Sequence, residues 1–147
     1  MFQNLKPKIL VVDDMPAMRK LICQVLEGLG FYRIQEAEDG MTAWELMKEG
    51  ALMPEESFHL VIADWNMPGF SGIDLLRAIR TNPMTSSVPF LMITARGEQA
   101  HIDEALFTGV SDYLVKPFDQ ITLSKKITEL FFLSHLRVTS CLCFRKI

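Results

Sequence analysis

The stretch FHLVIAD, residues 58–64, decides the fold class, because a run of apolar residues, interrupted only by His59, leads directly into an aspartate. The stretch ILVVDD, residues 9–14, has the same form and ends in two aspartates. Short apolar runs of this kind are typical of strands that are buried on both faces. Such strands occur in parallel sheets with helices packed on each side, so the pattern predicts an α/β fold.

Amphipathic segments alternate with the apolar runs along the whole chain. Each has apolar residues at helical spacing, Pro16 suits the first turn of the first helix, and Gly30 suits its end. The predicted architecture is a single (βα)5 domain, with surface loops at 49–57 and 81–87. The expected strands are 9–12, 32–37, 58–63, 88–94 and 113–115, and the expected helices are 16–29, 42–48, 73–80, 99–107 and 121–136.

Composition limits the classes of function. The chain has 147 residues and a formal net charge of -3, so it suits one globular domain without a basic field for nucleic acid. We find no signal peptide and no uncharged apolar stretch near the length of a membrane span, and we expect a cytoplasmic protein without membrane insertion. Cys141 and Cys143 have no second Cys or His pair to complete a zinc site.

Polar residues follow four of the predicted strands at the point where each strand ends. Asp13 and Asp14 follow the first strand, Asp64 the third, and Lys116 the fifth, while Thr94 ends the fourth. In open parallel sheets the functional crevice lies outside the carboxyl ends of the strands. We therefore expect these five side chains to meet in one crevice.

The expected cluster of acids favours a cation. At a separation of ~4 Å, each close pair of carboxylates costs about 4 kcal/mol at an effective dielectric near 20. A hard divalent ion such as Mg²⁺ would offset that repulsion, although Asp13 and Asp14 could instead cap the helix that begins at Pro16. Asp64 is then a candidate nucleophile for phosphoryl transfer, with Thr94 and Lys116 neutralising phosphoryl oxygens. Taken singly, each of these residues also has an ordinary structural explanation.

Two further residues have alternative interpretations. Tyr113 is either a half-buried aromatic at the edge of the sheet or a rotamer switch that follows Thr94. The Lys116-Pro117 bond is expected to be trans on frequency alone, since only about 5–6% of X-Pro bonds in folded proteins are cis.

Several motifs together resemble the response-regulator receiver family. They are VVDD at 11–14, DWNMP at 64–68, ITA at 93–95 and YLVKPF at 113–118, and the resemblance spans roughly residues 6–136. EAEDG at 36–40 and DWNMPG at 64–69 are most similar to the single-domain chemotaxis regulators. The resemblance implies a flavodoxin-like sheet of strand order 2-1-3-4-5, a cis Lys116-Pro117 bond, and a receiver domain over 6–137. It leaves the C-terminal tail, 138–147, without a clear role.

The resemblance also implies the function of a phosphorylation-activated response regulator in a two-component system. The phosphoryl donor would be a sensor histidine kinase or a phosphotransfer protein, and the signal would pass to a downstream protein target. The chain would be a signalling switch rather than an enzyme, catalysing only its own phosphorylation and dephosphorylation. Chemotaxis is suggested only by the local similarity around Asp64 and Tyr113.

Roles for individual residues follow from the same resemblance. Asp64 would be the phosphoacceptor, and Tyr113 the aromatic switch. Asn66 and Arg96, which is basic where the chemotaxis regulators have an acid, would set the lifetime of the acyl phosphate. Mg²⁺, with Mn²⁺ as a substitute, would bind Asp13, Asp14, Asp64 and the backbone carbonyl of Asn66, while Thr94, Ala95 and Lys116 would surround the phosphoryl group. The output face, on helix four, strand five and helix five, would include Gln99, Ile102, Leu106, Tyr113 and Lys126.

Other classes of function remain as alternatives. A Mg²⁺-dependent aspartyl-phosphate phosphohydrolase resembling the haloacid dehalogenases would need a second aspartate where this chain has Asn66. A phosphorelay shuttle would carry the same site. A flavodoxin-like cofactor binder is disfavoured, since Asp13 and Asp14 would repel a phosphate. Apolar residues of the last predicted helix, including Phe131, Phe132 and Leu136, leave a monomer or a weak homodimer as the expected states.

Overall fold

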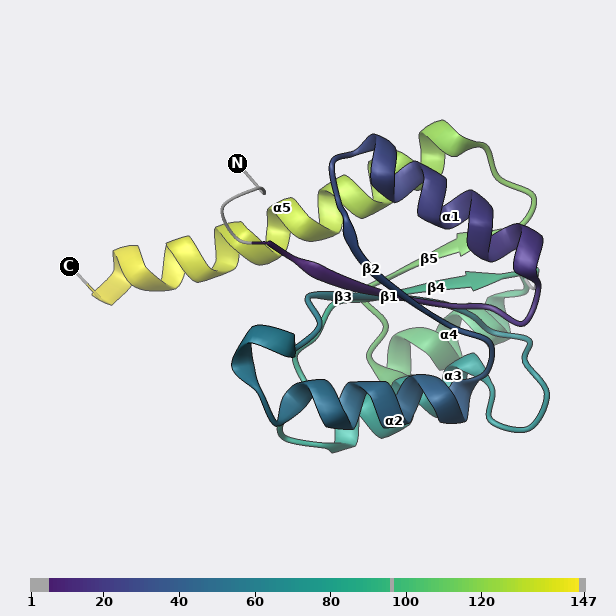
Figure 1. Ribbon diagram of the computed structural model, residues 1–147, viewed down its shortest axis with the longest axis horizontal. Helices are drawn as coiled ribbons and strands as arrows, with labels where there is room; N and C mark the ends of the chain where they lie inside the picture. Colours follow the sequence, from purple (N-terminus) through teal and green to yellow (C-terminus); the bar gives the residue numbers. More distant parts are fainter. Residues whose placement is uncertain (1–5, 96, 146–147) are drawn as a thin grey trace.

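The apolar run of residues 58–64 forms β3 (Leu60–Asp64), the central strand of a five-stranded sheet. In the computed structural model, which describes residues 6–95 and 97–145 and side chains as far as Phe132, the strand order is β2-β1-β3-β4-β5 and every pair is parallel. The predicted flavodoxin-like order is therefore confirmed (Figure 1). The other strands are β1 (Lys8–Val12), β2 (Arg33–Ala37), β4 (Phe90–Thr94) and β5 (Asp112–Val115).

Helices cover both faces of this sheet, as expected. In Figure 1, α1 and α5 lie above the sheet, and α2, α3 and α4 lie below it. The bounds are α1 (Pro16–Gly28), α2 (Gly40–Ala51), α3 (Gly72–Thr81), α4 (Gln99–Thr108) and α5 (Gln120–Arg145), with a short 3₁₀ helix, η1 (Pro54–Glu56), before β3.

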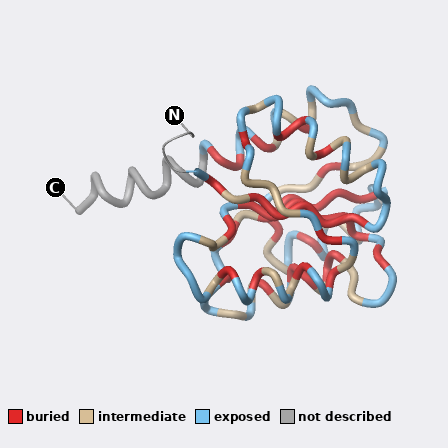
Figure 2. Tube along the Cα trace, in the orientation of Figure 1, coloured by how far each residue is buried: buried red, intermediate tan, exposed pale blue. Residues whose placement is uncertain are grey.

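The core is divided between the two faces by the alternation of side chains along each strand. Ile9 and Val11 pack with residues of α1 and α5, whereas Leu10 and Val12 pack with residues of α2 and α3. Every residue of β3 and β4 is buried, and Figure 2 shows the buried residues concentrated along the strands between the helical layers. Full burial of such a side chain contributes roughly 1.5–3 kcal/mol, which explains why the strands read as continuous apolar runs.

The helix predicted over 42–48 is longer than expected. α2 begins at Gly40, with the Asp39 side chain accepting a hydrogen bond from the Thr42 N–H at 2.7 Å, and part of the expected loop at 49–57 forms its last turn and η1. A Cβ at Gly40 would lie 2.3 Å from the Phe70 carbonyl oxygen, and one at Gly50 would lie 2.6 Å from that of Glu56. Glycine is required at both positions by close packing.

The C-terminal helix also differs from the prediction, since α5 runs to Arg145 rather than ending near Leu136. The side chains of the tail at 138–147, and Arg96, lie outside the described residues, so the expectations for them stay predictions. Among the helices that the structure describes, none has the length and hydrophobicity needed to cross a membrane.

Candidate functional site

Three carboxylates meet at the carboxyl edge of the sheet. The strand register pairs Val12 with Ala63, so Asp13 and Asp64 emerge side by side, and Asp14 follows. One oxygen from each of the three aspartates lies within 4.8 Å of the others. Asp13 and Asp64 are buried and Asp14 is exposed, which brings together the acids predicted to form a cation site.

Only one of the two oxygens of the Asp13 carboxylate accepts a hydrogen bond from the described residues. Its Oδ1 accepts a hydrogen bond from the Met15 N–H at 2.9 Å, while its buried Oδ2 has no hydrogen-bond partner among the described residues. The residue that caps α1 is Met15, which makes no side-chain capping bond. The alternative that Asp13 and Asp14 serve as helix caps is therefore not supported.

Burial raises the pKa of both inner carboxyl groups. The pKa of Asp13 rises to about 6, mainly because burial disfavours its charged form. The hydrogen bond from the Met15 N–H lowers this pKa, repulsion from Asp64 raises it, and attraction to Lys116 lowers it. The pKa of Asp64 is also raised by burial, against the opposing effect of Lys116. Burial therefore disfavours the ionised form of both aspartates even with Lys116 beside them.

The ammonium group of Lys116 lies beside the two buried carboxylates. Its Nζ lies 3.4 Å from Oδ1 of Asp64 and 4.0 Å from Oδ2 of Asp13. The Lys116 N–H donates to the Thr94 carbonyl at 2.7 Å, which ties the end of β5 to the end of β4. The Lys116-Pro117 bond is cis, as the family resemblance implies and contrary to the expectation from frequency alone.

The turn after β3 depends on a glycine. A Cβ at Gly72 would lie 2.3 Å from the Asp64 carbonyl oxygen and 2.9 Å from the Trp65 Cα, while the Gly72 N–H donates to the Trp65 carbonyl at 3.0 Å. α3 then begins with a capping box between Ser71 and Asp74. This contact places the start of α3 directly against the backbone of Asp64.

The remaining residues of the predicted site surround Asp64. Thr94 is buried, and Ala95 beside it is exposed. Asn66 is exposed, and its backbone N–H lowers the pKa of Asp64 by hydrogen bonding to it. Tyr113 is half-buried at the edge strand β5, in agreement with one of the two interpretations of this residue.

A narrow space too small for water separates Thr94 and Tyr113 from α4. The Trp65 ring forms one wall of it and meets the His101 ring edge-on, with ring centroids 5.6 Å apart. Trp65 follows Asp64 directly, so this contact connects the site with α4. His101 is absent from the residues predicted from the sequence, because no motif marks a residue that contacts the site through a ring.

Arg19 was also missed. Its Nη1 donates to the Asp13 carbonyl at 2.6 Å, and its Nε lies 3.3 Å from Oε1 of Glu36 on β2. The guanidinium therefore holds the β1–α1 turn against the neighbouring strand. A basic residue in the first turns of a helix carries no sequence signal for this role, because the acceptor is a backbone carbonyl.

The residues predicted for the output face lie on three elements, α4, β5 and α5. Gln99 and Leu106 are exposed on α4, and Ile102 is half-buried beside them. On α5, the Lys126 Nζ lies 3.0 Å from Oδ2 of Asp112 and 5.9 Å from the centroid of the Tyr113 ring. Four of the five predicted residues thus lie on helices that flank β5, and the fifth, Tyr113, lies on β5 itself.

Comparisons with known proteins show which family the sequence matches. The family model for the response regulator receiver domain matches residues 9–128. "Chemotaxis protein CheY-3" of Vibrio cholerae is 44% identical over 128 residues, which cover 87% of this chain and 94% of that protein. "Chemotaxis protein CheY" of Pseudomonas aeruginosa is 44% identical over 124 residues, covering 84% of this chain and 95% of that protein.

Solved structures give the same result. The crystal structure of the Vibrio cholerae chemotaxis protein CheY4 at low pH matches with a TM-score of 0.75 and 29% identity, covering 84% of this chain and 98% of that one. The receiver domain of the Francisella response regulator 1452 matches with a TM-score of 0.75 and 28% identity, covering 87% and 98%.

Proposed function

Since the chain belongs to the response regulator receiver domain family, we propose that it is a phosphorylation-activated switch of a two-component system. A sensor histidine kinase or a phosphotransfer protein donates a phosphoryl group to Asp64 in the cytoplasm. In this proposal the receiver domain spans residues 6–137, and the tail lies outside it.

The observation that carries the proposal is the position of Asp64. Its buried carboxylate lies 3.4 Å from the Lys116 ammonium and beside the carboxylates of Asp13 and Asp14. In the transfer, a bond forms between an Asp64 carboxylate oxygen and phosphorus while the bond to the donor breaks, and the donor keeps its electron pair. Lys116 and the Thr94 hydroxyl stabilise the negative charge on the phosphoryl oxygens, and the small side chain of Ala95 leaves room for them.

The three aspartates fit a Mg²⁺ ion, for which Mn²⁺ is a substitute. Oδ2 of Asp13 accepts no hydrogen bond from the described residues, and burial raises the pKa of this carboxyl to about 6, so a divalent cation bound beside it would favour the ionised form. Asp13, Asp14, Asp64 and the Asn66 carbonyl are the proposed ligands. The ion supplies charge neutralisation at a phosphoryl oxygen.

The output passes through the face formed by α4, β5 and α5. Thr94 and Tyr113 line the same narrow space next to α4, so a Thr94 hydroxyl drawn toward a phosphoryl group leaves room for the Tyr113 ring to follow. This supports Tyr113 as a switch and Gln99, Ile102, Leu106 and Lys126 as its partner surface. Because the relatives above are named as chemotaxis proteins, we propose a chemotaxis target as the partner.

Phosphorylation itself is tested by intact-protein mass spectrometry after incubation with acetyl phosphate. With Mg²⁺ present we expect the wild-type chain to gain the mass of one phosphoryl group, and we expect no gain after chelation of the metal. Asp64→Asn should gain nothing, whereas Asp103→Asn, a matched change on the exposed surface of α4, should behave as wild type. A mass gain retained in Asp64→Asn would place the acceptor elsewhere, and an unmodified wild-type chain would refute the proposal.

A further inference from the structure

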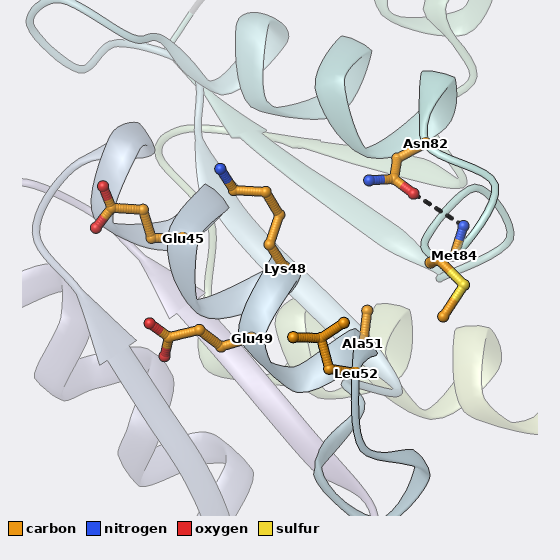
Figure 3. Close-up of a pocket in the computed structure, with 7 residues that line it drawn as sticks. All are labelled: Glu45, Lys48, Glu49, Ala51, Leu52, Asn82 and Met84. Atoms are coloured by element: carbon orange, nitrogen blue, oxygen red, sulfur yellow. Dashed lines mark hydrogen bonds between the residues drawn. The ribbon is translucent and has the colours of Figure 1, made fainter.

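A groove lies at the end of the molecule opposite the aspartates. It is formed where α2 ends, near the amino ends of the strands, and by the loop between α3 and β4, and it has a volume of about 470 Å³ (Figure 3). Nothing in the proposed phosphorylation chemistry uses this groove. Its lining residues are Glu45, Lys48, Glu49, Ala51, Leu52, Asn82 and Met84.

The apolar part of the groove is strongly exposed. Leu52 is 79% exposed and Met84 67%, and Met53, next to Leu52, is 56% exposed. Large apolar side chains that gather on a surface in this way often mark a site of protein association.

The backbone on both sides of the groove is fixed by packing, an ion pair and a hydrogen bond. Gly50 packs against the Glu56 carbonyl, the Lys8 Nζ lies 2.9 Å from Oε2 of Glu56, and the Asn82 side chain accepts from the Met84 N–H at 2.9 Å. A surface fixed before binding loses little conformational entropy when it is covered.

The rim of the groove favours a cationic occupant. Glu45 and Glu49 lie one turn apart on the same side of α2, and neither has an ion-pair partner among the residues that the structure describes (Figure 3). Like charges at this spacing destabilise a helix by a few tenths of a kcal/mol. The nearby Lys48 ammonium lies over the Trp44 ring, 5.6 Å from its centroid. A partner segment that carries both cations and apolar side chains would match this surface.

The chain itself contains such a segment. We propose that the groove binds the segment 133–147 (LSHLRVTSCLCFRKI) of a second copy of this chain. The segment carries three cationic side chains and no carboxylate side chain, together with apolar residues such as Leu142 and Phe144. Because α5 continues as one helix to Arg145, residues 133–145 do not turn back toward α2 of their own chain, and the occupant comes from another copy.

An association of this kind joins two different surfaces, the groove of one copy and the segment of the next. It is therefore concentration-dependent, and it extends beyond two copies unless the geometry closes a ring. Because charge contributes to it, added salt weakens it. Phosphorylation of Asp64 is not required, so the two proposals fail or succeed independently.

The first test is sedimentation of the unphosphorylated full chain over a range of concentrations in reducing buffer, which prevents disulfides through Cys141 and Cys143. We expect the wild-type chain to associate reversibly and Leu52→Asp to associate roughly tenfold more weakly. Ile121→Asp is the matched control, since Ile121 is 72% exposed on α5, and we expect it to associate as wild type. A wild-type chain that stays monomeric throughout, or equal association of Leu52→Asp and wild type, overturns the proposal.

The second test exchanges charge between the two surfaces. Glu45→Lys with Glu49→Lys makes the groove cationic, and Arg145→Glu with Lys146→Glu makes the segment acidic. Each double variant alone should lose most of its self-association. An equimolar mixture of the two should recover it, because the groove of each variant then meets a segment of opposite charge on the other variant. Mixing that restores nothing overturns the proposal.

Discussion

The raised pKa of the buried Asp13 carboxyl group leads to a quantitative prediction about stability. In Asp13→Asn, the amide oxygen can still accept from the Met15 N–H, but the side chain no longer carries a buried charge. We expect this variant to be more stable than the wild-type protein at about pH 8 when no metal is present, because it removes the cost of ionising Asp13 in the folded state.

The pKa of Asp13 gives the size of the effect. A rise from the ordinary value of 3.8 to about 6 means that the folded state binds this proton more tightly than the unfolded state. The wild-type protein therefore loses stability as the pH increases from about 4 to about 6, by about 3 kcal/mol in total. For a domain of this length, that corresponds to roughly 5–10 °C in the melting temperature.

The assay is urea unfolding of both proteins between about pH 4 and pH 8, with a chelator present. The two free energies of unfolding should coincide near pH 4, separate between about pH 4 and pH 6, and differ by a constant amount above that, with Asp13→Asn the more stable. Added Mg²⁺ should then stabilise only the wild-type protein and close the gap, by about 2.7 kcal/mol at a concentration of 100 times Kd. Asp103→Asn, an exposed control, should follow the wild type within about 0.5 kcal/mol. The reasoning fails if Asp13→Asn is less stable at pH 8, or if its advantage is the same at every pH.

Three further predictions concern the same edge of the sheet. Asp14→Ala should raise the urea midpoint of the metal-free protein, because repulsion among the carboxylates becomes weaker, and should lower Mg²⁺ affinity in calorimetry. A lower urea midpoint would show that Asp14 stabilises the fold instead. Lys116→Met should destabilise the protein by about 2 kcal/mol in urea, since Asp64 and Asp13 lose their neighbouring cation, and unchanged stability would contradict the geometry. Gly72→Ala should cost at least about 2 kcal/mol in thermal unfolding and slow phosphorylation by acetyl phosphate, because the added Cβ meets the Asp64 carbonyl. Gly28→Ala, which meets no atom within 4 Å, should not be destabilised comparably.

Much of the fold could be predicted from the sequence, because burial on both faces of β1, β3 and β4 leaves continuous apolar runs. The same runs end in polar residues, and parallel strands place those ends at one edge. The meeting of Asp13, Asp64 and Lys116 therefore followed from their positions in the sequence.

The differences arise from tertiary contacts that local patterns do not contain. α2 includes Gly40 and Gly50, which local propensity would exclude, because Phe70 and Glu56 pack where side chains would otherwise lie. Two features of Asp13 depend on three-dimensional placement. Its Oδ2 accepts no hydrogen bond from the described residues, and its carbonyl accepts one from Arg19. No residue pattern in the sequence encodes either feature.

The parallel order of the sheet has a consequence for how the protein is made. β1 is synthesised first, but its neighbours begin at Arg33 and Leu60, so its pairing waits until those residues have emerged from the ribosome. All three aspartates are therefore synthesised before β5 and Lys116. Pairing of β1 with β3 during that interval would bring the three carboxylates together without the ammonium that later lies beside them, a state that a free divalent cation would stabilise.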